Sequence, residues 1–154
     1  MPTFRSTRPV SHSAARMFDL VADVERYPEF LPLCESLRVL RRSQSGEGVE
    51  TLVAAMGVGY KAIQESFTTR VTLDRPRLRI FVEYVDGPFK YLENRWTFRP
   101  TERGCEVEFY INYEFRSRAL GLLMGAVFDK AFRKFAEAFE QRADAVYGRA
   151  AAGG

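Results

Sequence analysis

The segment Cys105–Phe115 alternates without interruption between side chains suited to a core and side chains suited to water. The odd-numbered positions carry Cys, Val, Phe, Ile, Tyr and Phe, and the even-numbered positions carry Glu106, Glu108, Tyr110, Asn112 and Glu114. A strict period of two is typical of a β-strand with one buried and one solvated face. The preceding stretch repeats the pattern, with Leu92, Asn94, Trp96 and Phe98 opposite Tyr91, Glu93, Arg95 and Thr97. These two segments therefore predict neighbouring strands that cover one core.

Turn-forming residues divide the wider region from Leu37 to Phe115 into six strand candidates. We expect the turns at Ser43–Gly48, Gly57–Gly59, Asp74–Pro76, Asp86–Pro88 and Pro100–Gly104. Thr3–Val10 alternates weakly and is expected to form a further, first strand. In the candidate that starts near Lys61, Glu65 falls on the same face as the apolar residues Ile63, Phe67, Val71 and Leu73.

Two helices complete the predicted elements. Beyond Phe115 the apolar period becomes helical: Phe128, Phe132, Phe135 and Phe139 predict one long amphipathic helix from about Ala119 to about Tyr147. A shorter helix is expected after a cap at Ser11 or Ser13, and it should end before Tyr27-Pro28 because a residue preceding proline avoids helical geometry. The segment YPEFLPLC, residues 27–34, then forms an irregular apolar connection.

This order of elements predicts an α+β fold. Because strands in a run pair antiparallel, we expect a curved antiparallel sheet of about seven strands wrapped around the long C-terminal helix, with an apolar cavity between them. The 154 residues suit one domain, here residues 1–148, followed by a disordered tail over 149–154. Aromatic residues make up 14% of the chain, which favours a thick core or a cavity lined with rings.

Charge and cysteine usage exclude several classes of function. The net charge is +3 and the charges are well mixed, so no specific DNA-binding surface is expected. The chain holds two cysteines, Cys34 and Cys105, and one histidine, His12, which are too few for a typical zinc site or a catalytic triad. We expect His12 in a solvent-exposed loop. Both thiols are expected to be reduced in a cytoplasmic protein, because no export signal is evident.

Three segments together carry a resemblance to a known family. They are residues 27–34 (YPEFLPLC), 85–98 (VDGPFKYLENRWTF) and 109–128 (FYINYEFRSRALGLLMGAVF). Over about residues 3–147 the chain resembles the coenzyme Q-binding START-like family, which includes the mitochondrial coenzyme Q chaperone and the bacterial ribosome-association toxin. The resemblance implies a helix-grip fold that binds coenzyme Q or a related polyprenyl lipid in support of respiration, without catalysis. It also implies a link of the bacterial branch to the large ribosomal subunit.

The pattern and the resemblance together predict the residues that line the cavity or its mouth. They are Tyr27, Phe30, Leu31, Leu33, Glu65, Phe67, Phe89, Leu92, Asn94, Trp96, Phe109, Ile111, Tyr113, Leu120, Leu123, Met124, Val127 and Phe128. Residues 27–33 form either a wall of the mouth or a plug at the end of the barrel. The Gly87-Pro88 turn either projects Phe89 outward or across the opening, or is a plain hairpin turn.

Two predicted sites have open interpretations. Ala119–Phe128, flanked by Arg116, Arg118 and Lys130, is either a lipid-contacting lid at a membrane surface or ordinary core or a dimer face. Its apolar run is far shorter than the roughly 20 residues of a membrane span. Glu65 either accepts a proton and, like Asn94, bonds a quinone oxygen, or it lies at the sheet rim or pairs with an arginine.

Three functions compete at this point. The first is a carrier of ubiquinone or another polyprenyl lipid, in the cytoplasm or at the inner face of the cytoplasmic membrane, with no required cofactor. The second is a protein that binds the large ribosomal subunit. The third is an enzyme of the polyketide cyclase type, in which Glu65, Tyr84 or Tyr113 would act as acid or base.

Overall fold

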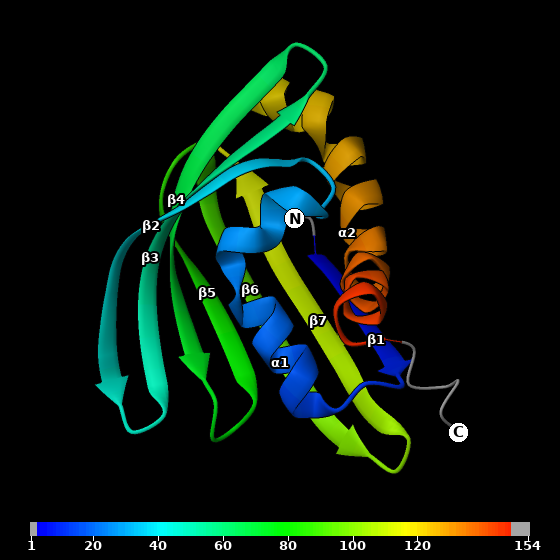
Figure 1. Cartoon of the computed structure of the whole chain (residues 1–154). Coiled ribbons are helices and arrows are strands. Elements are labelled where there is room, and N and C mark those ends of the chain that lie inside the picture. The colour runs from blue at the N-terminus through cyan, green and yellow to red at the C-terminus, as the bar shows by residue number, and fades with distance from the viewer. Residues whose placement is uncertain (1–2, 149–154) are drawn as a thin grey trace.

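The computed structural model describes residues 3–148, and the tail predicted at 149–154 lies outside them. All seven strands form one antiparallel sheet in the order β1-β7-β6-β5-β4-β3-β2 (Figure 1). This confirms the predicted α+β architecture with a long C-terminal helix. The elements are β1 Thr3–Val10, α1 Ala14–Ala22, the 3₁₀ helix η1 Val24–Glu29, β2 Cys34–Gly46, β3 Val49–Tyr60, β4 Ile63–Asp74, β5 Arg79–Asp86, β6 Phe89–Thr101, β7 Gly104–Phe115 and α2 Arg118–Tyr147.

The core lies between the concave face of the sheet and the two helices. In β7 every odd-numbered position from Cys105 to Phe115 is buried, and the even-numbered positions face outward. The helix α2 packs mainly on α1, β1 and β7, whereas β2 packs on β3 and η1 (Figure 1). The α2 side of the core is therefore held by close packing, and the side formed by β3, β4 and β5 faces α2 at a greater distance.

The turn predicted at Gly57–Gly59 is wrong, because these residues lie inside β3 and the chain reverses at Lys61 and Ala62. The two glycines instead allow side chains of β2 to approach the backbone of β3 closely. A Cβ on Gly57 would lie 2.4 Å from the Ser36 Oγ, and one on Gly59 would lie 2.2 Å from a carboxylate oxygen of Glu35. Glycine at these two positions lets the start of β2 pack directly onto β3.

Side-chain capping fixes the start of both helices. Ser13 accepts a hydrogen bond from the Arg16 amide at the start of α1, and Ser117 accepts one from the Leu120 amide at the start of α2. The helix α2 also ends in a network of ion pairs. Arg8 lies 2.7 Å from Glu140, and Arg142 lies 2.7 Å from Glu29. The C-terminal half of α2 is thereby tied to β1 and η1.

The expectation that His12 is solvent-exposed is wrong. His12 is 1% exposed, and its Nε2 lies 2.7 Å from the Asp144 Oδ1 on α2. The β6–β7 turn also covers this segment, since a Cβ on Gly104 would lie 2.2 Å from the Val10 carbonyl oxygen. The polar neighbours of His12 in sequence gave no sign of this burial, because the covering groups come from the far end of the chain.

Candidate functional site

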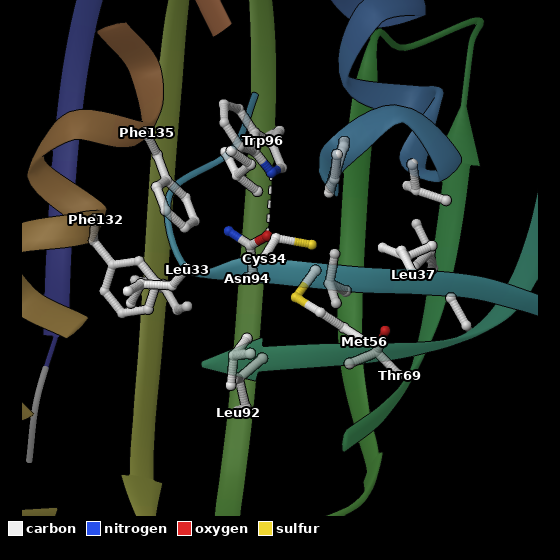
Figure 2. A pocket seen from close by; sticks show the side chains of 18 of the residues that line it. Leu33, Cys34, Leu37, Met56, Thr69, Leu92, Asn94, Trp96, Phe132 and Phe135 are labelled. Atoms are coloured by element: carbon white, nitrogen blue, oxygen red, sulfur yellow. Dashed lines mark hydrogen bonds between the residues drawn. The ribbon is translucent and has the colours of Figure 1, made fainter. Parts of the chain in front are cut away.

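An apolar cavity of about 110 Å³ lies between the inner face of the sheet and α2 (Figure 2). Inward-facing positions of β3 to β7 supply one side, and α2 supplies phenylalanines from the other. The lining residues are Val24, Tyr27, Leu31, Pro32, Leu33, Cys34, Leu37, Ala54, Met56, Val58, Phe67, Thr69, Val71, Ile80, Val82, Leu92, Asn94, Trp96, Phe109, Ile111, Phe128, Phe132, Phe135 and Phe139.

The segment from Leu31 to Cys34 forms one wall of this cavity, between η1 and β2. Leu33 has a φ of 70°, a left-handed conformation that is costly for a branched side chain. The conformation is held because the Leu33 carbonyl accepts a hydrogen bond from the Gly59 amide at 3.0 Å. Tyr27 supports the wall from behind, since its hydroxyl donates to the Val21 carbonyl and its ring packs edge-on against Phe139 at 5.3 Å.

Asn94 is the main polar group in the cavity wall. Its amide nitrogen donates to the Tyr110 carbonyl at 2.8 Å. Its amide oxygen accepts from the Trp96 Nε1 at 3.1 Å, the bond drawn in Figure 2. An amide has two hydrogens and two lone pairs, so one donor and one acceptor position remain free. These bonds fix the orientation of Asn94 and leave it able to bind one polar group of a ligand. Thr69 adds a buried hydroxyl on the β4 side.

None of the residues that line the cavity within 3–148 carries a side chain that is charged near neutral pH. The two weak acids present are shifted away from neutrality by burial, which raises the pKa of the Cys34 thiol to about 11 and the pKa of Tyr27 well above its usual range. Glu65, Tyr84 and Tyr113, named above as alternative acids or bases, lie outside this wall. The cavity is therefore built to exclude water and hold apolar groups.

Ten of the residues predicted from the sequence line the cavity; they are Tyr27, Leu31, Leu33, Phe67, Leu92, Asn94, Trp96, Phe109, Ile111 and Phe128. Phe132, Phe135 and Phe139 also line it and were identifiable from the phenylalanine stripe. Leu37, Ala54, Met56 and Val58 were missed. Their strands interrupt the alternation with glycines and arginines, so no periodic signal marked them.

Other predicted residues lie elsewhere in the core. Of the alternatives for the Gly87-Pro88 turn, an outward-projecting Phe89 is wrong and the turn simply joins β5 to β6, since Phe89 is 1% exposed and stacks on Phe115 at 4.8 Å. Phe30 packs edge-on against Phe139 at 5.1 Å, and Tyr113 packs against Phe132 at 5.4 Å. Leu120 and Val127 are partly buried against the core.

A second, much smaller hollow of about 10 Å³ lies beside the first. It is lined by Val58, Ile63, Glu65, Phe67, Pro88, Phe89, Phe115, Met124 and Phe128. Val58, Phe67 and Phe128 line both spaces. Glu65 therefore faces this hollow at the rim rather than the main cavity, and it forms no ion pair within residues 3–148.

Comparison with known proteins places this architecture. A curved sheet that grips a helix is the fold of a START superfamily protein from Mycobacterium smegmatis, which this chain matches with a TM-score of 0.77 and 20% identity over 94% of this chain and 98% of that chain. The family model for polyketide cyclase / dehydrase and lipid transport matches residues 10–140. The chain belongs to this family.

Two proteins with sequences similar to this chain carry different names. The ribosome association toxin RatA of Vibrio cholerae is 41% identical over 140 residues, which cover 90% of this chain and 93% of the relative. The mitochondrial coenzyme Q-binding protein COQ10 homolog B of Xenopus laevis is 29% identical over 151 residues, which cover 95% of this chain and 59% of the relative. No helix within residues 3–148 is both long and apolar enough to span a membrane.

Proposed function

We propose that this protein is a non-enzymatic carrier that binds coenzyme Q (ubiquinone) or a related polyprenyl lipid in support of respiratory electron transport. The observation that carries the proposal is the apolar cavity, whose wall holds one oriented amide and no charged group among the described residues. A quinone ring needs an apolar slot and a hydrogen-bond donor for its carbonyl, and the free hydrogen of Asn94 supplies that donor. The name of the COQ10 relative supports the same ligand class.

The size of the cavity determines how such a ligand fits. An engineered cavity of roughly 150 Å³ holds one benzene molecule, so the present 110 Å³ holds at most one small unsubstituted ring or one isoprene unit. A five-carbon isoprene unit contributes about 4 kcal/mol on burial, which is about a thousandfold in affinity. A longer lipid then requires the wall to widen, and the strained Leu33 segment together with the shared Phe128 is where we expect it to do so.

The experiment is lipid extraction of the purified protein followed by mass spectrometry, with a cavity-filling variant as its control. Leu92→Trp places extra volume into the cavity, and Leu40→Trp is the matched change at a residue that is 50% exposed. We expect a prenylated lipid in extracts of the unmodified protein and of Leu40→Trp, and little in extracts of Leu92→Trp. Equal lipid in all three, or none above an unrelated protein of the same size, would contradict the proposal.

A second candidate function is association with the large ribosomal subunit, favoured by the RatA relative and by one surface feature. Arg5, Tyr110, Arg95 and Phe81 lie opposite one another on β1, β7, β6 and β5 on the outer face of the sheet. The guanidinium carbons of Arg5 and Arg95 lie 4.8 Å and 5.2 Å from the centre of the Tyr110 ring. Alternating guanidinium and aromatic groups are the chemistry that stacks on exposed RNA bases.

This second candidate is tested by co-sedimentation with ribosomal subunits at increasing salt. We call Arg5, Tyr110, Arg95 and Phe81 the outer-face row. A neighbouring carboxylate already pairs with an arginine of this row, as Glu93 does with Arg95, so we expect ribosome binding to weaken only gradually with salt. The double variant Arg5→Ala, Arg95→Ala should lose association if the row meets RNA. Unchanged sedimentation of that variant would remove the row from consideration, and an absence of sedimentation would remove the function.

A further inference from the structure

The first half of α2 exposes leucines that the rest of the molecule leaves uncovered. Leu122 is 80% exposed and Leu123 is 63% exposed, which makes them the two most exposed large apolar residues within 3–148. Met124, beside them, is 2% exposed, so the helix turns one face inward and presents the leucines outward. The space over Gly125 is also open, because a Cβ built there would meet no atom within 4 Å.

The turn between β3 and β4 lies at the same end of the molecule (Figure 1). Ile63 at the start of β4 and Met124 of α2 line the same small hollow, so the two elements face each other. Tyr60 is 38% exposed, and Lys61 and Ala62 next to it are exposed. We name this end, formed by Tyr60–Ala62 and Arg118–Leu123, the docking tip.

The apolar space inside the protein leads toward the docking tip. The main cavity and the small hollow share Val58, Phe67 and Phe128, and Glu65 and Met124 also line the small hollow. A displacement of Phe128 would join the two spaces. The exposed leucines therefore lie at the end of a continuous series of apolar side chains that starts in the cavity.

The charges at the docking tip are mainly positive. Lys61 and Arg118 of the docking tip, and Lys130 further along α2, are exposed, and none of the three forms an ion pair with another residue in 3–148. No acidic residue occurs between Arg116 and Phe128. The acidic residues nearby are Glu65, Asp86 at the end of β5, Glu35 beside Gly59, and Asp129, which precedes Lys130 and pairs with Arg133.

The exposed arginines of the outer sheet face are arranged differently. Arg99 pairs with Glu106 and Glu108, and Arg95 pairs with Glu93. Arg38 and Arg41 on β2 are also exposed and form no ion pair within residues 3–148, but they flank a single leucine, Leu40, that is 50% exposed. The docking tip instead combines unpaired cations with two adjacent leucines that are 80% and 63% exposed. An anionic surface with an apolar interior complements both features.

We propose that the docking tip binds the surface of a bilayer that contains anionic lipids. Leu122 and Leu123 enter the boundary between headgroups and acyl chains, while Lys61, Arg118 and Lys130 face the phosphate groups. The cargo would then pass between the membrane and the cavity without crossing water. Membrane binding by the docking tip is inferred from the exposure of its leucines and from its charges. Only the transfer of cargo rests on the proposed function.

The test is co-sedimentation of the protein with vesicles of phosphatidylcholine alone and with vesicles that also contain phosphatidylglycerol. We expect binding to the mixed vesicles, weakening with salt. The double variant Leu122→Gln, Leu123→Gln and the variant Arg118→Glu should each weaken it by about tenfold. Leu40→Gln is the control, since it removes another exposed leucine, 50% exposed, near the middle of β2. Circular dichroism should show all variants folded, because no buried group is changed.

The outcomes separate this inference from the proposed function. Vesicle binding that is unchanged in the double variant, or equal for neutral and anionic vesicles, overturns the docking tip. A double variant that loses ribosome sedimentation but keeps vesicle binding overturns it too and assigns the tip to the ribosome. Lipid extraction of the same preparations reports on the cargo alone, so vesicle binding by a protein that yields no prenylated lipid supports the tip and contradicts the carrier.

Discussion

Cys34 and Cys105 are two buried thiols in different surroundings. Cys34 lines the cavity, whereas Cys105 is fully buried at the start of β7. Burial raises the pKa of each thiol from 9.0 to about 11. Both should therefore be poor nucleophiles at neutral pH, and only Cys34 has a face that a bound ligand can cover.

Alkylation of the two cysteines gives a prediction with an internal control. We expect slow modification at neutral pH and a rate that still rises between pH 9.0 and about 11, because the thiolate fraction of both groups grows over that range. Addition of a short-chain ubiquinone should slow modification of Cys34 and leave Cys105 unchanged, as read by peptide mass spectrometry. Equal protection of both would indicate general stabilisation rather than occupancy of the cavity.

The pair of His12 and Asp144 joins the chain before α1 to the end of α2. Removal of His12 leaves the Asp144 carboxylate without its partner and opens a space in the core. We expect His12→Ala to lower the free energy of unfolding by about 1–3 kcal/mol, measured by urea denaturation. Arg8→Ala is the comparison, because the Arg8–Glu140 pair is more exposed and should contribute less than about 1 kcal/mol. Equal losses in the two variants would show that the burial of His12 adds nothing.

At the scale of elements, α2 divides into two halves with different roles. Its C-terminal half buries Phe139, which is 1% exposed and contacts Tyr27, Phe30 and Trp96. Its first half exposes Leu122 and Leu123. The helix is thus anchored at one end and presents an uncovered surface at the other.

Two substitutions on α2 should separate these halves. Phe139→Ala removes a ring from the core and should cost about 3–5 kcal/mol, whereas Leu123→Gln should change stability by less than about 0.5 kcal/mol. Phe135 lies on the same phenylalanine stripe but is only partly buried and lines the cavity, so Phe139 is the better core reference. Thermal denaturation of both variants measures the difference, and a large loss in Leu123→Gln would make Ala119–Phe128 ordinary core.

An element is predicted well from the sequence when the residues that form its pattern lie close together in the chain. The alternation in Cys105–Phe115 and the phenylalanine stripe of α2 depend on residues close in the chain, and both elements were predicted to within a residue or so. The turn prediction at Gly57 and Gly59 was wrong because the role of these glycines depends on β2, a separate strand that packs against them. The prediction that His12 is solvent-exposed was wrong for the same reason, since its partner Asp144 lies on the last helix. The burial of His12 and the strand conformation at Gly57 and Gly59 are set by long-range contacts, which local sequence patterns do not reveal.

At the scale of the molecule, ligand binding should appear as stability. A ligand that binds only the folded state at about a hundred times its Kd adds about 2.7 kcal/mol. For a domain of this size that corresponds to about 5–10 °C in Tm. We expect a short-chain ubiquinone to raise the Tm of the unmodified protein by this order and to leave the Tm of Leu92→Trp unchanged, as measured by differential scanning calorimetry. A rise of the same size in Leu92→Trp would locate binding outside the cavity.

The uneven packing of α2 has a consequence for cargo selectivity. Because α2 packs mainly on α1, β1 and β7, the strands β3, β4 and β5 can bend outward while that packing stays intact. Under the proposed function, lipids that differ in the number of isoprene units would then be accommodated by elastic deformation of this side of the sheet, together with the widening expected at the Leu33 segment and Phe128. The quinone headgroup would instead meet the amide of Asn94, whose orientation is fixed by its bonds to Tyr110 and Trp96. Discrimination among quinones should therefore depend on ring substituents, with tail length changing affinity only gradually.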